Sequence, residues 1–258
     1  MRSNSKSLIL WCIGSIFMTL GGIFKFSSSL VSGQSINDIA SSMPKSIQAV
    51  LGIGSFDLSK ASGYYGMLFI YLAVMATIHS SMLGANIISK EERDKTSEFL
   101  FVKPRSRNKI IAAKLSAAFA NIILFNLATA TGSLAAFNFY AKGENINSEI
   151  YILMVAMLIL QLIFMAIGTF FSAFNKNSKA AASKATALLL VTFIMAKAMD
   201  FDSRLEFLKY LTPFKYFEAK DLIYGANFDP VSLILSFVII VSLLAATFIF
   251  FKRRDLNI

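Results

Sequence analysis

The chain has 258 residues, of which 56% are hydrophobic and only 16% are charged. A chain of this composition cannot bury its apolar surface in one water-soluble core, so we predict an integral membrane protein. The net charge of +10 does not indicate nucleic-acid binding, because Lys and Arg occur in short clusters beside apolar runs. The single cysteine, Cys12, excludes an internal disulfide, and the single histidine argues against a dedicated zinc site.

Six apolar runs are long enough to cross a bilayer, which requires roughly 20 helical residues. They cover residues 8–24, 64–88, 110–140, 150–174, 180–199 and 230–251. We interpret the first run as a retained span rather than a cleaved leader. The fifth run carries Lys184 and Lys197 near its ends, where long side chains can reach the interface. The sixth has the clearest beginning, because Asp229 can cap a helix and Pro230 suits its first position. We predict one all-α membrane domain spanning residues 1–258.

The distribution of charge predicts the orientation of these spans. Sixteen of the 25 Lys and Arg residues lie at the two termini and in the second and fourth connections between spans. Ten of the 15 acidic residues lie on the opposite side. Because basic residues accumulate in cytoplasmic loops, we predict that both termini and the second connection face the cytoplasm of a cell bounded by the plasma membrane.

Two segments on the predicted outer side are too polar to span. Residues 25–63 are rich in Ser and Gly and contain short apolar pieces, which favours a partly helical loop on the membrane surface. Residues 201–227 alternate charged and aromatic residues at helical spacing and then reach Pro213. This pattern predicts two short helices at or dipping into the outer interface, separated at that proline.

The most densely charged segment, residues 89–114, joins the second and third predicted spans. Glu91, Glu92 and Asp94 suit the first turn of a short helix, and Pro104 ends it beyond the apolar residues 99–102. A charged helix that ends in an apolar cluster is a docking surface. The alternative is a solvated connector whose basic residues only anchor the neighbouring spans.

Motifs for hydrolysis are missing from the sequence, which contains no G-x-x-x-x-G-K-[ST], no H-E-x-x-H and no G-x-S-x-G. The polar candidates inside the spans are His79, Asn121, Asn126 and Gln161. His79 could belong to a proton pathway, or it could hydrogen-bond to a neighbouring helix. For the three amides, packing between helices is favoured over substrate contact.

The residue order in the charged segment resembles the cytoplasmic loop of ABC-2 type transporter permeases. The matching residues are Glu91, Glu92, Thr96, Glu98, Phe99, Leu100, Pro104, Arg105, Ser106, Arg107 and Lys114. Lys95 stands where the family usually has Gly. The run L-T-P-F-K-Y-F at residues 211–217 looks like the T-P-F-x-Y-F segment before the family's last span, and residues 250–256 are similar to its F-x-x-R-D ending. The amphipathic helix that usually precedes the family's first span is short or missing here.

The resemblance implies the permease subunit of an ABC exporter. Such a subunit pairs with a second permease copy or a related permease, and two separate ATPase subunits bind ATP and Mg, so the chain itself needs no cofactor. The implied ATPase-coupling residues are Glu91, Glu92, Arg93, Lys95, Thr96, Glu98, Phe99, Leu100 and Phe101. The implied outer gate consists of Thr212, Pro213, Phe214, Tyr216 and Phe217. An aromatic and aliphatic wall between subunits would suit a lipid-like molecule or an amphipathic peptide.

Other classes of protein remain open at this point. A secondary transporter or channel without an ATPase predicts more buried charge than His79 supplies. A membrane immunity or scaffold protein would have no transport cycle. An intramembrane enzyme would need a catalytic pair in the spans, and the sequence offers no credible one.

Overall fold

The computed structural model describes residues 4–32, 36–53, 56–93, 106–140, 144–175, 178–201, 203–225 and 227–253. Within these residues every regular element is a helix. In chain order they are α1 (Ser5–Ser32), α2 (Ile36–Ser42), α3 (Lys45–Leu51), α4 (Ala61–Arg93), α6 (Arg107–Tyr140), α7 (Asn147–Phe174), α8 (Ser178–Met199), the 3-10 helix η2 (Ser203–Leu211), α9 (Pro213–Tyr216), α10 (Ala219–Gly225) and α11 (Pro230–Arg253).

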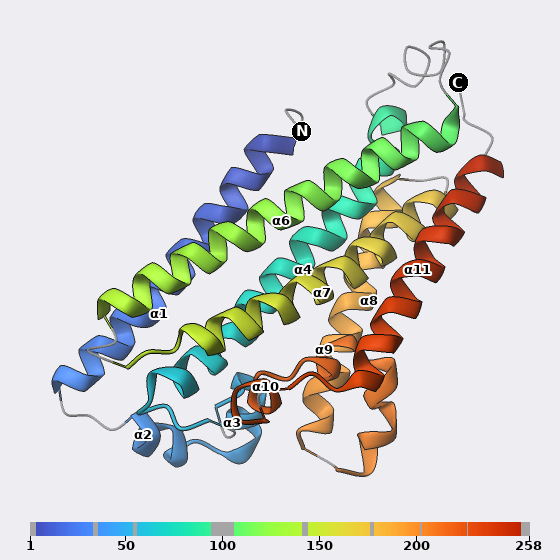
Figure 1. Cartoon of the computed structure of the whole chain (residues 1–258). Coiled ribbons are helices and arrows are strands. Elements are labelled where there is room, and N and C mark those ends of the chain that lie inside the picture. The colour runs from blue at the N-terminus through green and yellow to red at the C-terminus, as the bar shows by residue number, and fades with distance from the viewer. Residues whose placement is uncertain are drawn as a thin grey trace.

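Six of these helices, α1, α4, α6, α7, α8 and α11, are long and apolar enough to cross a membrane, which confirms the predicted number of spans. Figure 1 shows them side by side, with both described ends of the chain at one end of the bundle. We call this the terminus end. The short helices α2, α3, η2, α9 and α10 gather at the other end, which we call the short-helix end.

The helices α4 and α7 form the centre of the bundle. Their most apolar stretches are 61% and 67% buried, whereas those of the other four long helices are at most 28% buried. The outer helices pack around this pair, with α1 against α6 on one flank and α11 against α7 on the other (Figure 1). Within the bundle, α4 packs against α1, α6, α7 and α8.

The central pair is held close by glycines. A Cβ on Gly84 of α4 would lie 2.4 Å from the carbonyl oxygen of Met165, and a Cβ on Gly168 of α7 would lie 2.3 Å from that of Ser81. Small residues let helix backbones approach closely in membranes, where dispersion contacts must replace the missing hydrophobic drive. The two glycines thus permit backbone contact from both sides of the same crossing.

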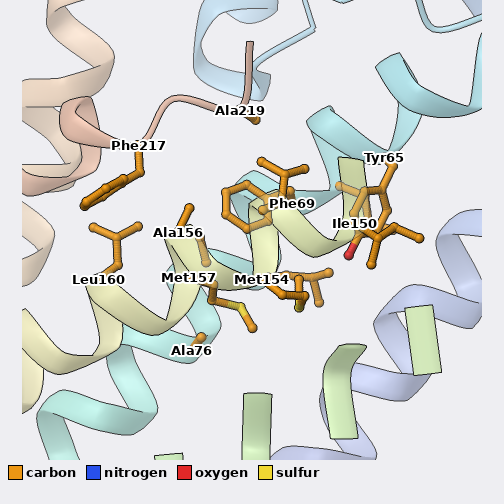
Figure 2. Packing of buried hydrophobic residues seen from close by; sticks show 14 of the residues in the cluster. Tyr65, Phe69, Ala76, Ile150, Met154, Ala156, Met157, Leu160, Phe217 and Ala219 are labelled. Carbon is orange, nitrogen blue, oxygen red and sulfur yellow. The ribbon is translucent and has the colours of Figure 1, made fainter. Parts of the chain in front are cut away.

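Large side chains pack the part of the core nearer the short-helix end. Figure 2 shows Tyr65 and Phe69 from α4 near Ile150 and Met154 from α7, and Phe217 beside Leu160 of α7. The backbone N–H of Ala61 also donates a 2.8 Å hydrogen bond to Glu144 Oε2, which places a carboxylate at the N-terminus of α4. A negative group at this position stabilises a helix.

Several predicted bounds were wrong. The helix of the first span continues to Ser32, beyond its apolar run, and α4 continues through Arg93. Glu91 and Glu92 therefore belong to the end of α4 and do not begin a separate helix. Residues 201–227 contain three short helices instead of two, and the first has 3-10 geometry. The partly helical character of residues 25–63 is confirmed by α2 and α3.

Two predictions from local sequence signals were confirmed. Asp229 caps α11, because its carboxylate accepts hydrogen bonds from the backbone N–H groups of Val231 and Ser232 at 3.2 and 3.3 Å and from the Ser232 hydroxyl at 2.8 Å. These bonds, led by the one from the Ser232 hydroxyl, lower the pKa of Asp229. Pro213 separates η2 from α9, where it occupies the first turn.

Candidate functional site

The predicted coupling segment lies largely outside the described residues. Glu91, Glu92 and Arg93 form the end of α4. The other predicted coupling residues, Lys95, Thr96, Glu98, Phe99, Leu100 and Phe101, fall in the range 94–105, which the structure does not describe. The two helices that this segment joins, α4 and α6, are described.

The ends of α4 and α6 are tied together beside this segment. Lys114 Nζ donates a 3.0 Å hydrogen bond to the carbonyl oxygen of Ile88 in α4. Arg107, the first residue of α6, donates from Nη1 to the carbonyl oxygen of Lys252 near the end of α11, at 3.3 Å. The segment therefore connects two helix ends that are already fixed to one another and to α11.

A separate apolar cluster lies beneath these helix ends. Buried residues from four helices contribute to it: Leu83, Ile87, Ile88, Ile111, Ala118, Ile122, Met165, Ala173 and Phe251. They come from α4, α6, α7 and α11, and the Gly84–Met165 contact lies in the same region. Because interiors at native packing density transmit strain, a force applied at the end of α4 should reach α7 and α11 through this cluster.

The predicted gate residues pack against the bundle at the short-helix end. Thr212 is fully buried, and its hydroxyl donates to the carbonyl oxygen of Leu208 at 3.0 Å. The ring of Phe214 lies 5.3 Å from the ring centroids of both Phe164 in α7 and Phe193 in α8. These contacts anchor α9 on two long helices, so the segment is a fixed part of the bundle surface.

The other gate residues are also held by specific contacts. The Tyr216 hydroxyl donates to the carbonyl oxygen of Tyr210, which joins α9 to η2. Phe217 makes an edge contact with Phe228, with ring centroids 6.0 Å apart. Pro213 is buried. All five predicted gate residues thus lie in one packed segment between α8 and α11.

A chain of ion pairs, not predicted from the sequence, fixes the same segment to the end of α8. Lys197 Nζ lies 3.0 Å from Asp200 Oδ2, and Lys215 Nζ lies 2.6 Å from Asp200 Oδ1. Lys215 also pairs with Glu218. Burial alone would lower the pKa of Lys215, but the hydrogen bonds to Asp200 and Glu218 outweigh this and raise it. The sequence offers a signal for two of these pairs, because Lys197 and Asp200, and likewise Lys215 and Glu218, are three residues apart.

The intramembrane polar residues make different kinds of contact. Asn126 Nδ2 of α6 donates to Met154 O at 3.1 Å and to Gln161 Oε1 at 3.2 Å, both in α7. Asn121 Nδ2 donates to Ala117 O, within its own helix. The buried His79 ring stacks on Phe125, with centroids 5.0 Å apart, and lies 5.6 Å from the Trp11 ring. Asn126 and Gln161 therefore connect two helices, whereas His79 packs among aromatic rings where α1, α4 and α6 meet.

Nothing in the described part of the chain gathers three or more His, Cys, Asp or Glu side chains in a way that could hold a metal ion.

Comparison with models of known protein families gives a match over residues 1–256 to the model described as ABC-2 family transporter protein. Comparison with curated proteins gives no match.

Proposed function

Because the chain belongs to the ABC-2 family of transporter proteins and is the membrane permease component of an ABC transporter, we propose that it forms the translocation pathway of an ATP-driven exporter. In this proposal two permease chains, either two copies or one copy and a related permease, assemble in the plasma membrane. Two cytoplasmic ATPase subunits bind these permease chains, and ATP and Mg bind to the ATPase subunits. The observation that carries the proposal is the central position of α4, the helix that leads directly into the charged segment.

The orientation with both termini in the cytoplasm is supported by charge. Figure 1 places the described chain ends, the end of α7 and the start of α8 at the terminus end, where α4 ends and α6 begins. In the sequence, the termini and the two connections that adjoin these helix ends hold sixteen of the 25 Lys and Arg residues. Since basic loops are retained in the cytoplasm, the terminus end is the side on which an ATPase would bind.

Coupling would begin at residues 91–101. The apolar residues Phe99, Leu100 and Phe101 would occupy a groove of the ATPase, while the charges of Glu91, Glu92, Arg93 and Lys95 would fix its register. ATP binding draws the two ATPases together and would displace the end of α4. The Lys114–Ile88 hydrogen bond and the apolar cluster beneath it support transmission of this displacement to α6, α7 and α11.

The segment containing Thr212, Pro213, Phe214, Tyr216 and Phe217 would act as the outer gate. Its attachment to α8 through the ion pairs of Lys215 and to α7 through Phe214 would couple the gate to the same bundle. The pathway between permease chains would be lined by aromatic and aliphatic residues. We therefore propose a hydrophobic or amphipathic substrate, either a peptide or a lipid-like molecule.

The class is tested by purifying the tagged chain from its own membrane in mild detergent and identifying the proteins that come with it. The proposal predicts a soluble ATPase carrying a phosphate-binding loop, in an amount about equal to that of this chain. A purification that retains a second permease chain but no ATPase, over several detergents, would contradict it and favour an ATPase-independent transporter or a scaffold.

A further inference from the structure

An open cavity of about 430 Å³ lies at the short-helix end and is lined by residues of this one chain. Residues of α3, α4, α7, α8, α9 and α10 line it, together with the residues that connect these short helices. Its volume falls in the range of about 300 to 1,000 Å³ that is typical of small-molecule sites. The proposed pathway between two permease chains does not account for this cavity, because residues of one chain line it.

The floor of the cavity is apolar and reaches into the membrane-spanning region. Phe69 and Ala73 of α4 and Leu160 of α7 line it, and all three are at most 3% exposed. Ala73 follows the first residue of α4 by about three helical turns, which corresponds to roughly 18 Å along the axis. Phe193 and Phe214 add aromatic surface. Such a floor suits a hydrocarbon chain.

The rim of the cavity is charged, and most of its charge is compensated internally. Asp200 and Glu218 are paired with Lys215, and Asp200 is also paired with Lys197. The remaining rim charges are Lys45, Lys220 and Asp221. The two lysines come from α3 and α10, and among the described residues neither forms an ion pair. Because Lys215, just outside the lining, also neutralises Asp200 and Glu218, the two lysines and Asp221 leave one positive charge at the rim, which favours an anionic group.

We propose that this cavity binds an amphipathic anion, with its hydrocarbon tail on the floor formed by Phe69, Ala73 and Phe193 and its phosphate or carboxylate group at Lys45 and Lys220. The volume suits a molecule with one tail. This inference goes beyond the proposed function, because the binding requires neither a second permease nor an ATPase. The two proposals can therefore fail separately.

The test measures binding to the full chain reconstituted alone in phosphatidylcholine nanodiscs. Lysophosphatidylglycerol, which is anionic, should bind saturably at one molecule per chain. Lysophosphatidylcholine with the same tail should bind at least tenfold more weakly, and inorganic phosphate should not bind. Equal affinity for both lysolipids would overturn the assignment of an anionic group. Phosphate binding as tight as that of the lysolipid would overturn the assignment of the tail.

Variants locate the site. Lys45→Gln combined with Lys220→Gln should weaken lysophosphatidylglycerol binding at least tenfold, whereas Lys60→Gln, an exposed lysine at the same end that does not line the cavity, should leave it unchanged. Ala196→Phe should block the cavity, and Ala198→Phe, on the same turn of α8 but outside the lining, is its control. Unchanged binding in the lysine double variant would overturn the proposal even if the phenylalanine variants failed to fold.

Discussion

Gly84 and Met165 bring the two central helices into backbone contact, because a Cβ at position 84 would lie 2.4 Å from the Met165 carbonyl oxygen. The reciprocal contact of Gly168 with Ser81 places the second glycine against α4. This crossing lies on the side of the bundle where the charged segment joins α4 to α6. In the mechanism proposed above, it makes α4 and α7 move as one body.

Replacing Gly84 with Ala should therefore destabilise the bundle. The new methyl group meets backbone atoms, which cannot rotate away, and overpacking of this kind costs about 1 to 3 kcal/mol. Gly21→Ala in α1 is the matched control, because no atom outside its own helix lies within 4 Å of the added Cβ. Thermal unfolding of the purified proteins should show a lower midpoint for Gly84→Ala only. Equal midpoints would contradict the close crossing.

The hydrogen bond between Asn126 and Gln161 should contribute measurably to the packing of α6 on α7. Asn126→Ala removes donors to both Gln161 Oε1 and Met154 O and should lower the free energy of unfolding by about 1 to 2 kcal/mol. Asn121→Ala should cost less, because Asn121 bonds within its own helix. Denaturation in mixed micelles compares the two. A larger loss for Asn121→Ala would show that Asn126 does not join the helices.

The ion pairs of Asp200 should hold the gate segment in place. Asp200→Asn removes the negative charge that Lys197 and Lys215 share, so trypsin should cut after Lys209 several times faster than in the wild type. Asp221→Asn, at an exposed acid in the neighbouring helix α10, should have little effect. Rapid cleavage at Lys209 in the wild type would mean that the segment is not anchored as the structure indicates.

The pH dependence of this anchoring follows from the raised pKa of Lys215. A lysine whose folded pKa is raised contributes its full stabilisation below the unfolded value of about 10.4 and loses it as the pH rises through the folded value. The rate of tryptic cleavage, corrected for the activity of trypsin on a model peptide, should stay constant between about pH 7 and about pH 9. A steep increase within this range would rule out charged Lys215 as the anchor.

Membrane orientation can be tested with single cysteines in a Cys12→Ala background. Lys60→Cys lies at the short-helix end and Asn108→Cys at the terminus end, and both positions are exposed. In intact cells a membrane-impermeant thiol reagent should label only Lys60→Cys, whereas both should react after permeabilisation. Labelling of Asn108→Cys alone in intact cells would reverse the orientation and place the charged segment outside.

The spans were predictable because each needs only an uninterrupted run of about 20 apolar residues. Their ends were less predictable. The helices α1 and α4 continue beyond their apolar runs, to Ser32 and Arg93. Hydropathy does not predict such polar extensions of a helix. Helix ends were predictable where one residue determines the local backbone geometry, as Asp229 does at the start of α11 and Pro213 at the start of α9.

Contacts between distant segments could not be predicted in the same way. The pairing of Asp200 with Lys215 depends on how η2 and α9 fold back over the end of α8. The contact of Gly84 with Met165 depends on the register of two long helices. The cavity requires the floor from three long helices and the rim from α3 and α10 to meet. A single sequence contains no signal that fixes these registers.

The most direct test of the account compares the ATPase content of the wild-type complex with that of a Phe99→Ala/Leu100→Ala variant by size-exclusion chromatography. Each side chain, if buried in the ATPase, should contribute about 1.5 to 3 kcal/mol, so the variant should insert normally but lose the ATPase and its transport activity. Phe207→Ala/Leu211→Ala replaces the same two types of side chain, both exposed at the short-helix end, and should retain both the ATPase and transport. Full retention of the ATPase and of transport by the Phe99→Ala/Leu100→Ala variant would contradict the proposed coupling and leave residues 91–101 as a solvated connector.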